Sequence, residues 1–131
     1  MCRQSPDKIL LIKRSDNAKV APGLYSLIGG SLEKNESYRQ ALVREINEEV
    51  GIKTDPNELQ FQHVFYRNGT EHELVACVFE CTNWQGEPFN KEPMKHTDLL
   101  WVTLNDLPQN MIKAHRNVLN LISQKVQYSE Q

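Results

Sequence analysis

Residues 30–52 read GSLEKNESYRQALVREINEEVGI, and this stretch indicates a helix with acidic side chains along one face. Glu45, Glu48 and Glu49 are spaced i, i+3 and i+4, so a helix places all three carboxylates on the same side. Like charges at this spacing repel one another, by roughly 0.2–0.5 kcal/mol per pair on an isolated helix. A cation that binds between them removes this penalty.

Two interpretations of the acidic face follow from the spacing. Three oxygen ligands that converge on one point suit Mg²⁺ or Mn²⁺, which bind carboxylates together with water and substrate phosphates. The alternative is a solvated acidic surface, although such faces usually include lysine at i+4 and this one does not. Arg44 lies four residues before Glu48, where it can brace that carboxylate. The spacing alone leaves both interpretations open.

The same stretch carries the signals that start and stop a helix, which we expect over residues 36–50. Asn35 can serve as the N-cap, and Ser37 with Gln40 offers a second capping arrangement. Gly51 is suited to the C-terminal stop. An apolar stripe at i, i+4 and i+8 can pack on a sheet while the acids face a cleft, and it consists of Leu42, Ile46 and Val50.

The remaining patterns predict a single α/β domain over residues 1–131, with a mixed sheet between two helices. A turn is expected at residues 67–70, and a second helix over residues 111–126. Strands are expected over residues 8–13, 24–28, 59–66, 73–81 and 99–104. The side chains of the second helix that should face inward are Ile112, Val118, Leu119 and Ile122.

Composition excludes several classes of function. The chain has 131 residues, a formal net charge of −2 and 24% charged residues, which argues against a broad nucleic-acid surface. No apolar run approaches the roughly 18 residues that span a membrane, and no leader pattern opens the chain. The three cysteines lack zinc spacing, and Cys77 and Cys81 are expected to be buried small hydrophobes. A reducing, cytoplasmic compartment is consistent with this usage.

The acidic segment resembles the Nudix box, which specifies nine positions at fixed spacing over 23 residues. The resemblance implies an α/β/α sandwich with a strand-loop-helix-loop catalytic motif. Nudix chains usually have a full strand before the one expected at residues 8–13, so here the N-terminal strand should be short or missing, or the chain truncated within it. The common Pro-Gly-Gly and Gly-Glu become Ile28-Gly29-Gly30 and Asn35-Glu36, which could alter the loop. The matching positions are Gly30, Glu36, Arg44, Glu45, Ile46, Glu48, Glu49, Gly51 and Ile52.

The resemblance also implies roles for the residues of the box. Glu45, Glu48 and Glu49 would bind Mg²⁺, or Mn²⁺ in its place, and the backbone carbonyl of Gly30 often joins them. Arg44 resembles the arginine that orients these acids. Glu36 would be a supporting carboxylate, or a capping acid at the helix N-terminus.

Further site residues are implied outside the box. The stretch WQGEPFNKE, residues 84–92, resembles the MutT-type loop that carries a glutamate, which here is Glu92. It would ligate the metal or take a proton from water, with Asp98 and Glu87 as the alternatives. Arg14, Tyr25 and Asn110 are the expected nucleotide contacts, although the spacing around Asn110 differs by one residue. None of the four histidines is assigned a role, and most are expected on the surface or in loops.

The implied activity is Mg²⁺-dependent hydrolysis of a nucleoside diphosphate linked to another moiety. We favour a MutT-like nucleoside triphosphate pyrophosphohydrolase, because the chain is short and contains the 84–92 stretch. ADP-ribose, dinucleoside polyphosphates and 5′-triphosphate RNA are alternative substrates. The alternative from another class is a non-catalytic Nudix sensor, but such domains commonly lose box carboxylates that this chain keeps. A small nucleotide is the expected partner, and a monomer or homodimer the expected state.

Overall fold

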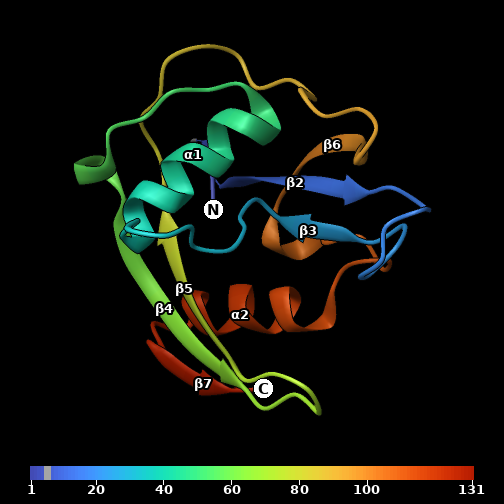
Figure 1. The fold of residues 1–131 in the computed structure, drawn as a ribbon, viewed down its shortest axis with the longest axis vertical. Coiled ribbons are helices and arrows are strands. Elements are labelled where there is room, and N and C mark those ends of the chain that lie inside the picture. The colour runs from blue at the N-terminus through green and yellow to red at the C-terminus, as the bar shows by residue number, and fades with distance from the viewer. Residues whose placement is uncertain (5–6) are drawn as a thin grey trace.

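The computed structural model describes residues 1–4 and 7–131, and it shows strands between two helices (Figure 1). The helix α1 (Tyr38–Val50) lies on one side of β2 and β3, and α2 (Lys113–Ser123) lies on the other. This arrangement confirms the predicted α/β sandwich. The strands are β1 (Arg3–Gln4), β2 (Lys8–Arg14), β3 (Tyr25–Leu27), β4 (Gln60–Arg67), β5 (Leu74–Glu80), β6 (His96–Val102) and β7 (Tyr128–Glu130), with short 3₁₀ turns at Pro56–Glu58 and Leu104–Asp106.

The strand β2 is the centre of the first sheet and pairs antiparallel with β1, β3 and β6. Its residues Ile9 to Ile12 are all buried because both faces of the strand are covered. Leu10 and Ile12 belong to the cluster that includes Ile46 of α1, whereas Ile9 and Leu11 belong to the cluster that includes Leu119 of α2. Alternation along one strand therefore joins the two helical layers to a common core.

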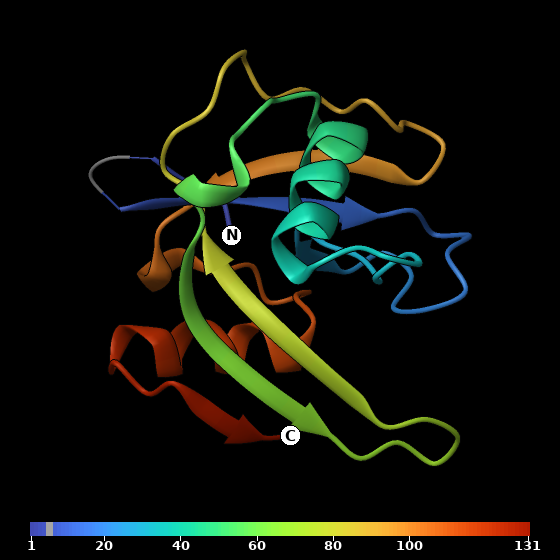
Figure 2. The ribbon, with the colours of Figure 1, turned by 60° about the vertical axis from the view of Figure 1, so that its left-hand side comes forward.

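The second sheet is built on β4, which pairs antiparallel with β5 and parallel with β7. The long, twisted β4 and β5 run beside α2 (Figure 2), and Phe65 and Val78 pack against Val118 of that helix. A parallel β-bridge, in which the backbones of Cys2 and Cys81 pair, connects the start of the chain to the end of β5. The predicted single mixed sheet is thus divided in two, and the first strand is short, as expected.

Several predicted boundaries are corrected. Asn35 has a φ of +65° and is not the N-cap, because Ser37 and Gln40 form the capping box instead. The strand expected over residues 99–104 begins earlier, at His96, and α2 is shorter than the predicted 111–126. The strand β7 was not predicted at all. In the part of the chain that the structure describes, neither helix has the length and apolar character needed to cross a membrane.

The C-terminal end of α1 positions the loop that follows β5. Gly51 ends the helix in the left-handed conformation, with φ of +70°, as predicted. A Cβ at this position would lie 2.2 Å from Cε1 of Phe89, so the glycine also lets the loop approach closely. The amides of Phe89 and Lys91 donate to the carbonyls of Val50 and Glu49, both at 3.1 Å. These bonds bring the next residue of the loop, Glu92, to the acidic end of α1.

Candidate active site

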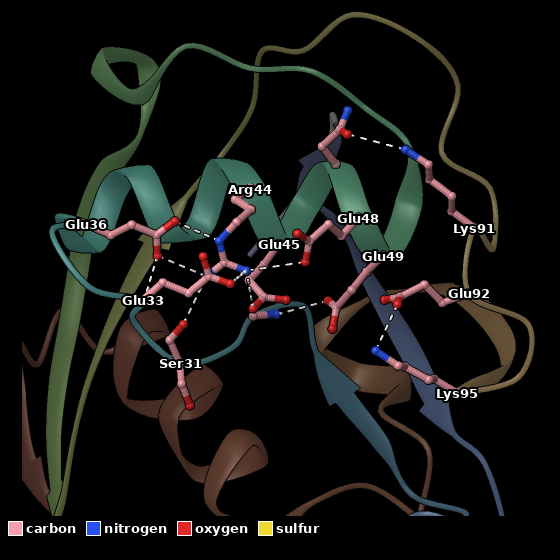
Figure 3. A network of polar contacts seen from close by, with 12 residues as sticks. Ser31, Glu33, Glu36, Arg44, Glu45, Glu48, Glu49, Lys91, Glu92 and Lys95 are labelled. Atoms are coloured by element: carbon pink, nitrogen blue, oxygen red, sulfur yellow. Dashed lines mark hydrogen bonds and ion pairs between the residues drawn. The ribbon is translucent and has the colours of Figure 1, made fainter.

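Arg44 is the centre of the acidic face of α1 (Figure 3). Its Nε and Nη2 donate to the two carboxylate oxygens of Glu36, at 2.7 and 3.0 Å. Its Nη1 donates to Glu45 at 2.9 Å and to Glu48 at 3.3 Å, and Nη2 also donates to the carbonyl of Ser31 at 3.0 Å. One guanidinium therefore connects three carboxylates of the box to the preceding loop, and the predicted contact with Glu48 is confirmed.

Glu36 connects the helix to the loop that carries the glycines. Its second carboxylate oxygen accepts a hydrogen bond from the backbone amide of Glu33 at 2.9 Å. The Arg44 guanidinium, together with this amide, lowers the pKa of Glu36 to about 2. Glu36 is thus a permanently ionised brace for the 30–36 loop, as the supporting role requires, and Asn35 lets the loop turn through its positive φ.

Glu49 is the buried member of the acidic cluster, with only 8% of its surface exposed. Burial, with added repulsion from Glu45 and Glu92, raises its pKa to about 8. The backbone amide of Gly29 donates to its Oε2 at 3.3 Å, and Nε2 of His96 lies 3.9 Å from its Oε1. Glu45 and Glu48 are both more exposed than Glu49. The ionised form of Glu49 is therefore the one that most needs a cation as a partner.

Gly30 leaves room for the carboxylate of Glu45. A Cβ built on Gly30 would lie 2.1 Å from Oε1 of Glu45, which is far closer than atoms can approach. The glycine of the box therefore allows its backbone to lie directly against this acid. The structure thus brings Gly30 and Glu45 together, and their role as metal ligands stays a prediction.

Glu92 approaches the acids from outside α1. Its backbone amide donates to Oδ1 of Asn90 at 3.2 Å, and Lys95 forms an ion pair with its carboxylate at 3.0 Å. Its charge contributes to the raised pKa of Glu49. Asp98, an alternative to Glu92, instead accepts a hydrogen bond from Tyr25 at 2.5 Å. The charge of Glu92, outside α1, therefore bears on Glu49, whereas the structure ties Asp98 to Tyr25.

A cavity of about 450 Å³ opens beside Glu49, between β3, β5 and α2. Arg14 lines it, and its Nε donates to the carbonyl of Val20 at 2.7 Å. Tyr25 and Asn110 are not among its lining residues; they contact each other instead, because the amide of Tyr25 donates to the Asn110 carbonyl at 2.9 Å. Arg14 therefore shares the cavity with Glu49, and nucleotide contact by Arg14, Tyr25 and Asn110 stays a prediction.

The histidines are where sequence reasoning failed most clearly. The expectation of surface or loop positions is wrong for His63 and His96, which are buried on strands, and for His115, which is half-buried on α2. His96 lies beside Glu49 and its Nδ1 has no hydrogen-bond partner among residues 1–4 and 7–131. His115 lines the cavity. No sequence spacing relates His96 or His115 to the acids, and only the fold brings them near Glu49.

The acids suit a divalent cation in their chemistry. Within the described residues, no three His, Cys, Asp or Glu side chains are already placed to hold an ion together. Arg44 donates to Glu45 and Glu48, whereas the pKa of Glu49 is raised by burial and by the nearby charges of Glu45 and Glu92. Because the available ligands are all oxygen, a hard cation such as Mg²⁺ fits them better than zinc or copper does.

The buried Glu49 also predicts how the stability of the metal-free chain depends on pH. An ordinary glutamate ionises near pH 4.5, whereas Glu49 in the folded chain keeps its proton up to about pH 8. Between these values the folded state binds more protons than the unfolded state, so its free energy of unfolding falls as the pH rises, by at most about 1.4 kcal/mol per pH unit. Glu49→Gln, which does not ionise, should gain stability relative to wild type over this range.

Chemical denaturation of both proteins without metal, at several pH values from about 4.5 to about 8, measures this difference. A constant difference in the free energy of unfolding across the range would contradict the assignment of a raised pKa to Glu49.

Comparison with known proteins agrees with the box and with the fold. A family model described as the NUDIX domain matches residues 1–122. The nucleoside triphosphatase NudI of Escherichia fergusonii is 32% identical over 130 residues, covering 90% of this chain and 89% of its own length. The 8-oxo-dGTP diphosphatase of Escherichia coli is 32% identical over 108 residues, covering 81% of each chain.

A solved structure gives the same result. The MutT Nudix hydrolase from Burkholderia pseudomallei has a TM-score of 0.79 and 33% identity, covering 91% of this chain and 93% of its own. This chain and that structure are thus similar in both sequence and fold over most of their lengths. The chain therefore belongs to the Nudix family, as a MutT-type Nudix hydrolase that acts on phosphoric anhydride bonds.

Proposed function

We propose that this chain is a Mg²⁺-dependent nucleoside triphosphate pyrophosphohydrolase, which converts a nucleoside triphosphate and water to a nucleoside monophosphate and pyrophosphate. Mn²⁺ is the alternative metal. The observation that carries the proposal is the position of Glu49, which belongs to the acidic cluster of α1 and also lines the cavity of about 450 Å³. Arg14, a cation suited to phosphate, lines the same cavity.

Glu45, Glu48 and Glu49 would hold the metal, together with the backbone carbonyl of Gly30. A divalent cation bound there supplies charge neutralisation at the phosphoryl oxygens and acidifies a bound water. Glu45 and Glu48 contact Arg44 in the structure, and the Gly30 backbone lies against Glu45. Of these proposed ligands, Gly30 and Glu49 line the cavity.

The remaining residues orient these ligands and move protons. Arg44 and Glu36 hold the acids and the glycine loop in fixed relative positions. The charge of Glu92, which lies outside α1, contributes to the raised pKa of Glu49, so Glu92 is our candidate to take a proton from the attacking water or to complete the metal site. Arg14, Tyr25 and Asn110 are the proposed nucleotide contacts, of which only Arg14 lines the cavity.

The relatives support a nucleotide as the substrate. Two of them are named as a nucleoside triphosphatase and as an 8-oxo-dGTP diphosphatase, and each covers most of this chain. Both names describe nucleoside triphosphates, in agreement with the size and chemistry of the cavity. We also propose a cytoplasmic location, since Cys2, Cys77 and Cys81 are all free thiols.

The test is a substrate panel with product identification in the presence of Mg²⁺. The panel contains the common nucleoside triphosphates, ADP-ribose, a dinucleoside polyphosphate and 5′-triphosphate RNA. We expect triphosphates to be cleaved between the α and β phosphates, with equal amounts of monophosphate and pyrophosphate. Release of inorganic phosphate and a diphosphate, a better rate on ADP-ribose or RNA, or tight binding without turnover would each overturn the proposal.

A further inference from the structure

His115 lines the cavity, and its Nε2 has no hydrogen-bond partner among the described residues. The residue lies in the first turn of α2 and lines the cavity opposite the strands. Its Nδ1 accepts a hydrogen bond from the backbone amide of Leu27 at 3.1 Å. An amide can only donate, so Nδ1 carries no proton and the proton of the neutral ring is on Nε2. The bond to Leu27 therefore fixes both the orientation and the tautomer of the ring.

The ring stays neutral at physiological pH. Burial lowers the pKa of His115 to about 4, with further contributions from the charges of Arg14 and Arg67. The N-terminal end of a helix also disfavours a cation. A neutral ring with Nδ1 occupied can donate through Nε2 and cannot accept, so it distinguishes acceptors from donors on a ligand.

The surroundings of His115 suit the flat ring of a nucleobase. Val118, three residues on along α2, shares its face of the helix and packs with Phe65 and Val78. All three of these side chains also line the cavity. A pocket with mostly apolar walls and one fixed donor holds an aromatic ring by contact and selects it by that donor.

One stretch of backbone connects this donor to the catalytic acids. The amide of Leu27 binds His115, and the amide of Gly29, two residues later, binds Glu49. Two residues of extended chain span at most about 7 Å. His115 and Glu49 therefore lie on walls of the same cavity at a separation that a single nucleotide can bridge, with its phosphates near Glu49.

We propose that His115 determines base specificity, by donating from Nε2 to a keto oxygen of the nucleobase and so favouring keto bases over their amino counterparts. This inference rests on the proposed function, because it takes the ligand of the cavity to be a nucleotide. A keto oxygen accepts the hydrogen bond, whereas an exocyclic amino group at the same position would place two donors face to face.

Two substitutions distinguish the donor at Nε2 of His115 from the hydrogen bond that its Nδ1 accepts from Leu27. His115→Asn keeps an oxygen that can accept from the Leu27 amide but removes the donor at the reach of Nε2. His115→Gln restores an N–H group at that reach. His72→Asn is the matched control, since His72 is exposed in the turn between β4 and β5.

The measurement is the affinity for non-hydrolysable α,β-methylene analogues, compared within the pairs UTP and CTP, and GTP and ATP. In wild type we expect the keto member of at least one pair to bind roughly three- to tenfold more tightly, the value of one hydrogen bond. His115→Asn should bring that ratio close to one, while His115→Gln and His72→Asn keep a preference. Thermal unfolding of each variant shows whether the fold is retained.

The outcomes separate this inference from the proposed function. An unchanged keto preference in His115→Asn, or no keto preference in wild type, overturns the inference even if triphosphates are hydrolysed. A keto preference that depends on His115 supports it even if the substrate panel shows another cleavage pattern. Because binding is measured without turnover, a failure of the catalytic proposal does not decide the result.

Discussion

Glu49→Gln is expected to lower kcat by roughly 10²- to 10⁴-fold, the range seen when a proton-transferring or charge-bearing group at the reaction centre is removed. Glutamine has nearly the same shape as glutamate, and its amide oxygen can still accept the hydrogen bond from Gly29. The substitution therefore removes a buried carboxylate that can ionise to bind a cation, while the hydrogen bond from Gly29 can be kept. Steady-state hydrolysis of the best triphosphate, over a range of Mg²⁺ concentrations, measures the effect.

The stability of the same variant distinguishes a catalytic role from a structural one. Glu49 is 8% exposed and its pKa is raised, so its ionised form is costly in the folded chain without metal. We therefore expect Glu49→Gln to have an unchanged or higher Tm at neutral pH although its activity is lost. Glu71→Gln, an exposed acid in the β4–β5 turn, is the control and should match wild type in both measurements. Full activity of Glu49→Gln would exclude Glu49 from the metal site.

The helix α1 was predictable because its signals are local. The apolar stripe, the Ser37–Gln40 capping box and the Gly51 stop all act within a few residues, and each is present in the structure. The one error was the N-cap: the sequence offered both Asn35 and Ser37, two residues apart, and the helix uses Ser37. In β2, a continuous apolar run predicted a strand buried on both faces, which is how it packs.

The division into two sheets was not predictable from such signals. The backbone β-bridge between Cys2 and Cys81 joins residues far apart in the sequence, and β7 pairs with β4 across more than sixty positions. The residues of β7 are mostly polar and show no apolar alternation. They are held in part by His63 on β4, whose Nε2 lies 2.8 Å from the Ser129 hydroxyl. Tertiary contact, rather than local propensity, makes this segment a strand.

The site shows the same division between local and long-range information. Helical spacing placed Glu45, Glu48 and Glu49 together, but it could not show that Glu49 alone becomes buried while the side chain of Glu48 stays 50% exposed. The loop after β5 and the side chain of His96 approach Glu49, and both come from distant parts of the chain. His115 was missed because it reaches the cavity from α2, without any motif of its own.

Arg44→Lys is expected to lower kcat by roughly 10- to 100-fold, the usual effect of losing a group that orients metal ligands. The guanidinium contacts Glu36, Glu45 and Glu48 at once, and binds Glu36 through two parallel hydrogen bonds. A lysine ammonium has the same charge but presents a single point, so it cannot span these carboxylates. The positions of the acids should therefore loosen although the net charge of the site is unchanged. Activity at saturating nucleotide and metal measures this loss.

Arg39→Lys, the same change on the same helix, is the control. Arg39 donates to the carbonyl of Leu59 and lies over the ring of Phe79, so it contacts the core rather than the acids. We expect it to keep wild-type kcat, whatever its effect on Tm.

The acids around Arg44 repel one another when they are held less well, and salt screens that repulsion. The Tm of Arg44→Lys should accordingly lie below that of wild type at low ionic strength and recover in part as salt or Mg²⁺ is added. A wild-type kcat in Arg44→Lys would show that charge alone, without the fork of the guanidinium, is enough to organise the carboxylates.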